Sequence, residues 1–164
     1  FLRLGTEYPK GTQALDLGSS PGGSTLFLQE RGFNVTAVDP GKMNPEILQK
    51  DNVRFLQIPI QTLKPKELPE NIKILTADMN LPPKVIMQQC LKVARQLPEV
   101  ETLFLTLKMP SIRLIKSLER YLKWCESAGF EHTKALQLYY HRREILIVTS
   151  KKDLFEEERS FYQA

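Results

Sequence analysis

Short apolar runs rich in β-branched residues alternate with helical patterns along the whole chain of 164 residues. This alternation is typical of β-α units, in which each helix crosses over between two parallel strands. We expect strands at residues 13–17, 34–39, 52–58, 71–78 and 101–108. We expect helices to begin near Gly22, Pro45, Pro83 and Ser111.

The last two strand-like segments, 131–140 and 144–150, are separated only by the sequence His-Arg-Arg. A gap this short cannot hold a crossover helix, so the two segments must form an antiparallel pair. The sequence therefore predicts one α/β domain with a mainly parallel sheet and an antiparallel strand at or near one edge.

Composition narrows the class of protein. Apolar residues make up 41% and charged residues 26%, which is typical of a globular chain. No apolar run approaches the ~20 residues that span a bilayer, and no signal-peptide pattern opens the chain. Cys90 and Cys125 lie in helical patterns without C-x-x-C spacing, so we expect core thiols in a reducing, cytoplasmic setting. The net charge of +4 permits nucleic-acid binding without arguing for it.

The loop after the first strand reads Leu-Asp-Leu-Gly-Ser-Ser-Pro-Gly-Gly-Ser-Thr, residues 15–25. In parallel sheets, ligands bind beyond the carboxyl ends of the strands. Neither the dinucleotide fingerprint nor the phosphate-binding loop fits this spacing. An acidic, glycine-rich loop suits a ligand with a positive charge that needs close approach to the backbone. The alternative is that the glycines only form a tight turn.

Asp39 ends the second predicted strand, where a carboxylate commonly accepts hydrogen bonds from ribose hydroxyls. Together with the glycine loop, it indicates a nucleoside that carries a cationic centre. S-adenosylmethionine is the common ligand of this kind. The alternative is that Asp39 merely ends a strand.

Residues 15–25 resemble motif I of the FtsJ-like ribose 2′-O-methyltransferases, and the similarity extends along almost the whole chain. Four further segments match in order: VDPG, LTADMN, LTLKMP and QLYYHRREILIV. The subgroup most similar methylates a cytidine ribose in large-subunit ribosomal RNA. The resemblance implies a Rossmann-like class I methyltransferase fold with a seven-stranded sheet, S-adenosylmethionine as cofactor, RNA as substrate and no metal.

The resemblance also implies a set of cofactor-binding residues: Asp16, Gly18, Ser19, Ser20, Pro21, Gly22, Gly23, Ser24, Asp39, Gln57 and Asp78. One position departs from the family, which has an acid after the third strand that contacts the adenine amine. This chain has Ile58 and Pro59 there. Adenine recognition must then use the backbone or Gln57, or be weaker.

Three charged residues, Asp78, Lys108 and Glu144, stand at or near strand ends on one rim of the predicted sheet. The proton of a ribose 2′-hydroxyl must leave as its oxygen attacks, and a nearby ammonium stabilises the developing alkoxide. The resemblance implies that Lys108 supplies this ammonium, that Asp78 positions it, and that Glu144 orients the lysine or the ribose. A structural ion-pair network is the alternative.

The family uses a second lysine, located before motif I. Lys10 is the sole lysine before Asp16, and its surroundings look like a loop, so we assign it no role. The opening residues read like the end of a helix, which favours a fragment that lacks N-terminal residues. We expect a catalytic domain over 1–152 and an acidic tail over 153–164.

Two other functions stay open. The first is a catalytically incomplete module that binds S-adenosylmethionine or RNA. The second is a methyltransferase acting on another substrate, although residues 77–84 lack the aromatic residue of the N/D-P-P-Y/F pattern typical of base-amine enzymes.

Two groups of residues are candidates for RNA binding. Arg113 and Lys116 begin a basic stripe on the helix predicted from Ser111. The second group can stack a splayed base and hold phosphates, and comprises Tyr139, Tyr140, Arg142 and Arg143. A solvated helix face and edge-strand packing are the respective alternatives. The target nucleotide and the oligomeric state are not predicted.

Overall fold

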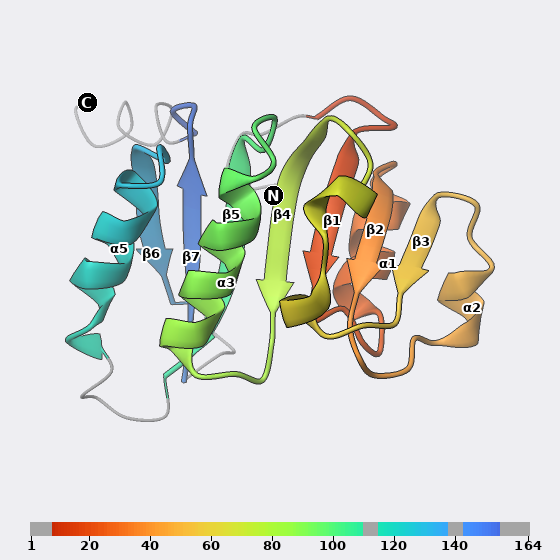
Figure 1. Ribbon diagram of the computed structural model, residues 1–164, viewed down its shortest axis with the longest axis horizontal. Helices are drawn as coiled ribbons and strands as arrows, with labels where there is room; N and C mark the ends of the chain where they lie inside the picture. Colours follow the sequence, from red (N-terminus) through yellow and green to blue (C-terminus); the bar gives the residue numbers. More distant parts are fainter. Residues whose placement is uncertain (1–7, 110–114, 138–142, 155–164) are drawn as a thin grey trace, which may run out of the picture.

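The computed structural model describes residues 8–109, 115–137 and 143–154, in which strands and helices alternate (Figure 1). The strands are β1 (Gln13–Leu17), β2 (Asn34–Val38), β3 (Val53–Leu56), β4 (Ile72–Asp78), β5 (Thr102–Lys108), β6 (His132–Leu136) and β7 (Glu144–Ser150). The helices are α1 (Gly23–Glu30), α2 (Pro45–Leu48), α3 (Pro83–Arg95) and α5 (Leu118–Glu126), with short 3-10 turns η1 (Ile60–Thr62) and η2 (Pro65–Glu67).

The strands form one sheet in the order β3-β2-β1-β4-β5-β7-β6. Neighbours among β1 to β5 run parallel, β7 runs antiparallel to β5, and β6 runs antiparallel to β7. The predicted mainly parallel, seven-stranded α/β fold with an antiparallel hairpin is confirmed. Chain order moves outward from β1 in one direction and from β4 in the other, so the topological switch point lies between these two strands.

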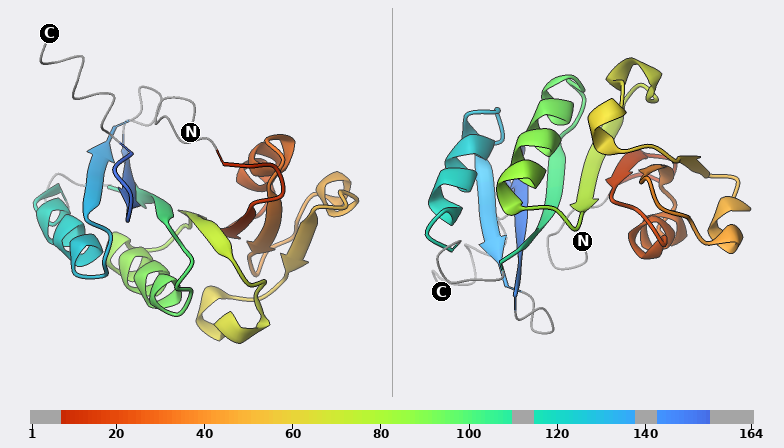
Figure 2. Two further views of the ribbon diagram at one scale, coloured as in Figure 1. Left: turned by 90° about the horizontal axis from the view of Figure 1, so that it is seen from above. Right: turned by 60° about the horizontal axis from the view of Figure 1, so that its bottom comes forward.

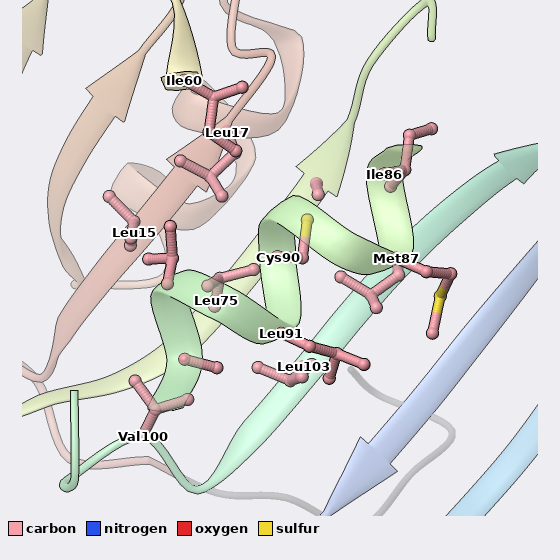
Figure 3. Close-up of a cluster of buried hydrophobic side chains, with 14 of the residues drawn as sticks. Leu15, Leu17, Ile60, Leu75, Ile86, Met87, Cys90, Leu91, Val100 and Leu103 are labelled. Atoms are coloured by element: carbon pink, nitrogen blue, oxygen red, sulfur yellow. The ribbon is translucent and has the colours of Figure 1, made fainter. Parts of the chain in front are cut away.

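Both faces of the sheet are covered. Successive side chains of a strand point to opposite faces, so each strand contributes apolar residues to both sides. Leu15, Leu75 and Leu103 lie on the face covered by α3, and Figure 3 shows them beneath that helix. Their neighbours Ala14 and Ile74 belong to a separate cluster on the other face. Figure 2 shows α3 and α5 on one side of the sheet and α1 on the other.

The predicted helix starts are partly confirmed. The Asn44 side chain accepts a hydrogen bond of 2.9 Å from the Glu46 amide and so caps α2, and α3 begins at Pro83 as expected. The helix predicted to begin near Ser111 is not continuous in the part that the structure describes. The chain turns at Lys116 and Ser117 before α5. Ser117 flanks the start of α5, and its hydroxyl accepts a hydrogen bond of 3.2 Å from the Arg120 side chain.

The two cysteines are core thiols, as predicted. Cys90 on α3 and Cys125 on α5 are free and fully buried. Burial raises the pKa of Cys90 and raises the pKa of Cys125 to about 11, so both stay protonated at neutral pH. Within the described ranges, no helix is long and apolar enough to cross a membrane.

Candidate active site

A cavity of about 570 Å³ opens at the carboxyl ends of the parallel strands, where the chain order switches between β1 and β4. Its lining includes eight of the predicted site residues in the glycine loop and at the ends of β2 and β4, together with the predicted catalytic lysine. These residues are Gly18, Ser19, Ser20, Pro21, Gly23, Ser24, Asp39, Asp78 and Lys108. Open α/β sheets bind ligands at this position.

Gly18 lets the loop pass between β2 and β4. Its amide donates a hydrogen bond of 2.9 Å to the Val38 carbonyl at the end of β2. Its φ is 75°, and a Cβ at this position would lie 2.4 Å from the carbonyl oxygen of Asp78. Only glycine therefore fits here, because both the backbone conformation and the available space exclude a side chain.

Gly22 begins α1 rather than lining the cavity. Its φ is 122°, and a Cβ there would lie 2.3 Å from Cδ1 of Ile47 and 2.5 Å from Sδ of Met43. Its carbonyl accepts the Leu26 amide at 2.8 Å, the first hydrogen bond of the helix. The loop thus packs on the α2 region, and the start of α1 faces the cavity through Gly23 and Ser24.

Asp16 lies beneath the loop, only 1% exposed, and does not line the cavity. Its Oδ2 accepts hydrogen bonds of 2.6 Å from both Ser24 and Thr25, and its Oδ1 accepts one of 2.8 Å from Thr76. Burial raises the pKa of Asp16, while the three hydroxyl donors act in the opposite direction. The carboxylate joins β1 to the first turn of α1 and to β4, and so holds the loop in shape.

The hydroxyls of Ser19 and Ser20 are buried in the cavity wall without a hydrogen-bond partner among the described residues. A buried hydroxyl that makes no hydrogen bond destabilises the protein that contains it. Two such groups side by side in a cavity wall are suited to bind polar atoms of a ligand.

Asp39 lines the cavity beyond β2, and its Oδ1 accepts a hydrogen bond of 2.6 Å from the Gly41 amide. This contact fixes the carboxylate at the cavity edge. The structure places Gln57 outside the cavity, where its exposed amide donates a long hydrogen bond of 3.5 Å to the Pro40 carbonyl. The wall after β3 is formed instead by residues 59–61.

Lys108 and Asp78 meet at the lip of the cavity, with 3.9 Å between Nζ and Oδ1. Asp78 aligns with Thr106 between β4 and β5, and Lys108 aligns with Glu144 between β5 and β7. Because aligned residues share a face and the side-chain period is two, all three charged groups lie on one face of the sheet. The side chains of Lys108 and Asp78 are 39% and 53% exposed, so the pair is open to solvent.

Sequence reasoning missed part of the cavity. Ile60 and Gln61 contribute from η1, and residues 79–81 contribute from the segment after β4. The second group directly follows the predicted Asp78, and that adjacency was the signal. Ile60 and Gln61 follow β3 by several residues, and no sequence pattern marks where that segment crosses the sheet.

Lys10 precedes β1 and lies at the amino ends of the parallel strands, opposite the end that holds the cavity. Its side chain packs beside Gly32, where a Cβ would lie 3.0 Å from Cγ of Lys10, just beyond the far end of α1. Among the described residues, Lys108 is the only cation that lines the cavity.

The structure describes two of the six predicted RNA-binding residues. Lys116 and Arg143 are exposed, and the Arg143 carbonyl accepts a hydrogen bond of 2.6 Å from the Met109 amide next to Lys108. Four other predicted residues lie outside the described residues: Arg113, Tyr139, Tyr140 and Arg142. Within the described ranges, no three His, Cys, Asp or Glu side chains gather as a metal site would require.

Known proteins resemble this chain in both sequence and fold. Two relatives named "Ribosomal RNA large subunit methyltransferase M" match it. That of Halorhodospira halophila is 30% identical over 140 residues, covering 85% of this chain and 40% of the relative. That of Aeromonas salmonicida is 32% identical over 144 residues, covering 84% and 38%. The chain thus spans about two fifths of the length of these curated relatives.

A solved structure supports the fold. The 1,6-didemethyltoxoflavin-N1-methyltransferase of Burkholderia thailandensis, solved with S-adenosylhomocysteine, superposes with a TM-score of 0.61 at 16% identity, covering 88% of this chain and 72% of that one. The fold is therefore that of the class I methyltransferases. The family model for FtsJ-like methyltransferases matches residues 3–155. The chain belongs to the FtsJ-like methyltransferase family.

Proposed function

We propose that this chain transfers a methyl group from S-adenosylmethionine to a ribose 2′-hydroxyl of RNA, with ribosomal RNA as the substrate. The observation that carries the proposal is the Lys108–Asp78 pair, which stands at the lip of a cavity built by a glycine loop and Asp39.

The residues present fit S-adenosylmethionine, the methyl donor of this family and fold. A volume of about 570 Å³ falls within the usual range for small-molecule sites. The described lining carries two carboxylates, Asp39 and Asp78, which suits a cationic ligand. The unpartnered hydroxyls of Ser19 and Ser20 offer hydrogen bonds to polar atoms of the ligand.

The bound cofactor would supply a methyl group on a positively charged sulfur. Lys108 acts on the other reactant, the ribose hydroxyl. Its ammonium at the cavity lip stabilises the negative charge that develops on the 2′-oxygen as the hydroxyl proton leaves. In the neutral form, the same amine can accept that proton.

Asp78 and Glu144 position the lysine. Asp78 approaches Nζ from β4, and Glu144 stands opposite Lys108 on β7. Carboxylates on two sides restrict the rotamers of the long lysine side chain, which keeps the amine near one point of the rim. Alignment of the reacting oxygen with the methyl group provides much of the rate in reactions of this kind.

An RNA substrate is supported by the names of the curated relatives and by the open rim. Lys108 is 39% exposed, so a ribose on a macromolecule can reach it. Lys116 follows β5 and Arg143 directly precedes β7, and both side chains are exposed and positively charged. In the complex with RNA, Lys116 and Arg143 would contact phosphates. A ribosomal RNA substrate would also place the enzyme in the cytoplasm.

The test is methyl transfer from labelled S-adenosylmethionine to ribosomal RNA, followed by digestion to nucleosides and mass spectrometry. We expect a ribose-methylated nucleoside. Methylation on a base contradicts the ribose assignment. Binding of S-adenosylhomocysteine by calorimetry without transfer to any RNA supports instead a module that only binds the cofactor.

A further inference from the structure

Asn80 contributes a neutral amide to the end of the cavity that holds the Lys108–Asp78 pair. It lines the cavity two residues after Asp78, so the two residues lie within about 7 Å of each other along the chain. Its side chain is exposed, and no hydrogen bond joins its amide to another residue among those that the structure describes. The amide is therefore available to a ligand at the cavity lip.

The backbone that carries Asn80 is held on both sides. Met79 is 7% exposed in the main core, and a Cβ at Gly18 would lie 2.5 Å from its Cγ, so Met79 packs against the glycine loop. Leu81 packs against the same core, and α3 begins at Pro83. Figure 1 shows this short connection between the end of β4 and α3. Asn80 thus projects from a fixed segment, as a residue that selects a ligand requires.

The chemistry of this segment suits a nucleic-acid base. Leu81 lines the cavity and the adjoining Pro82 is exposed, so both offer apolar surface for the face of a base. The Asn80 amide has both donors and an acceptor, which match the mixed polar edge of a base. A phosphate only accepts hydrogen bonds and is usually held by cations. The neutral amide therefore fits a base better than a phosphate.

The position of the segment relative to Lys108 indicates which base this is. In a nucleotide, the base and the 2′-hydroxyl are attached to neighbouring carbons of one ribose. A 2′-oxygen held at Lys108 therefore brings the base of the same nucleotide to the cavity lip. The glycine loop and Asp39 line the part of the cavity that suits the cofactor, so Asn80 is left to the acceptor.

We propose that the Asn80 amide hydrogen-bonds the edge of the base of the acceptor nucleotide, while Leu81 and Pro82 pack against its face. The segment then selects the base whose ribose is methylated. This inference rests on the proposed function. A base that does not match leaves polar groups unpaired in the complex, and that loss disfavours the wrong nucleotide.

The test begins by mapping the nucleotide of ribosomal RNA that the unsubstituted chain methylates. Four transcripts of that segment, which differ only in the base at this position, are then compared by kcat/KM at saturating S-adenosylmethionine. We expect the unsubstituted chain to prefer one base at least about 10-fold. Asn80→Ala should lower kcat/KM about 10-fold on that transcript and little on the others, so that the preference falls to within about 3-fold.

Two controls separate base selection from a structural role. Calorimetry should show that Asn80→Ala binds S-adenosylhomocysteine within about 2-fold of the unsubstituted chain. Gln88→Ala removes another exposed amide, on α3 and outside the cavity. It should leave kcat/KM, the base preference and the cofactor affinity unchanged.

Four outcomes overturn the inference. The unsubstituted chain may methylate all four transcripts equally, Asn80→Ala may keep the full preference, or it may lower kcat/KM equally on all four. A loss of cofactor affinity of about 10-fold or more in Asn80→Ala would assign the amide to the cofactor instead. In each case the unsubstituted chain still forms a ribose-methylated nucleoside and the proposed function stands. If it forms none on any RNA, the proposed function fails as well.

Discussion

Nζ of Lys108 lies 3.9 Å from Oδ1 of Asp78, across the ends of two adjacent parallel strands. The distance is at the long end for an ion pair, and both side chains are substantially exposed. Such a pair adds little to stability, since solvent-exposed ion pairs contribute about 0–1 kcal/mol. The pair is therefore better explained by a role at the cavity lip than by a role in holding the sheet together.

Lys108→Ala should abolish methyl transfer and leave the affinity for S-adenosylhomocysteine within a few fold, because Lys108 acts on the hydroxyl and not on the cofactor. Transfer is measured with labelled cofactor and affinity by calorimetry. Lys92→Ala, at an exposed position on α3 outside the cavity, is the control and should retain full activity. Near-normal turnover of Lys108→Ala would refute the catalytic role.

Gly18→Ala should lower the free energy of unfolding by more than about 2 kcal/mol and abolish binding of S-adenosylhomocysteine. The added methyl group would meet the Asp78 carbonyl at 2.4 Å, which forces the loop away from β4. Urea unfolding and calorimetry measure the two effects.

Gly11→Ala separates the clash from backbone strain. Gly11 also has a positive φ, 85°, but a Cβ there meets nothing within 4 Å. This variant should lose only about 1 kcal/mol and keep its affinity for the ligand. Equal losses in both variants would show that the close approach to β4 is unimportant.

In contrast to Gly11→Ala, Ser19→Ala should weaken ligand binding without lowering the stability of the free protein. The Ser19 hydroxyl is buried without a partner in the described structure, so its removal should leave the free energy of unfolding unchanged or raise it by up to about 1 kcal/mol. Affinity for S-adenosylhomocysteine should fall by about 5–10-fold, as measured by calorimetry. A clear loss of stability with unchanged affinity would contradict a ligand-binding role.

Asp16 should make stability depend on pH. Burial raises its pKa in the folded protein, so the folded state holds the proton more tightly than the unfolded state. Its stabilising contribution is complete below the pKa of an unfolded aspartate, about 3.9, and is lost as the pH rises through the folded pKa. Asp16→Asn removes this titration.

Urea unfolding between pH 3 and pH 8 measures the effect. The stability of the unsubstituted chain relative to Asp16→Asn should decline as the pH rises. Asp51→Asn, at an exposed position, is the control and should not change the trend. A difference that grows with rising pH would mean that the three hydroxyl donors outweigh desolvation.

The local order of strands and helices could be predicted from the sequence because it depends on near neighbours. Alternating apolar runs located all seven strands, and Asn44 with Pro45 located α2. The three-residue gap before β7 required an antiparallel pair. The helix predicted from Ser111 was the exception, because a turn at Lys116 and Ser117 interrupts it.

The sequence by itself determined which residues stand at the strand ends. It therefore determined that the glycine loop, Asp39, Asp78 and Lys108 all lie at the carboxyl ends of the parallel strands. Only the tertiary structure decided which of them reach the cavity. It placed Asp16 beneath the loop and Gln57 outside the cavity, and it brought Gln61 into the cavity wall. The reason is physical: strand ends follow from local patterns, whereas the path of a crossing segment depends on long-range packing, such as the burial of Ile60 in the same core cluster as Leu17.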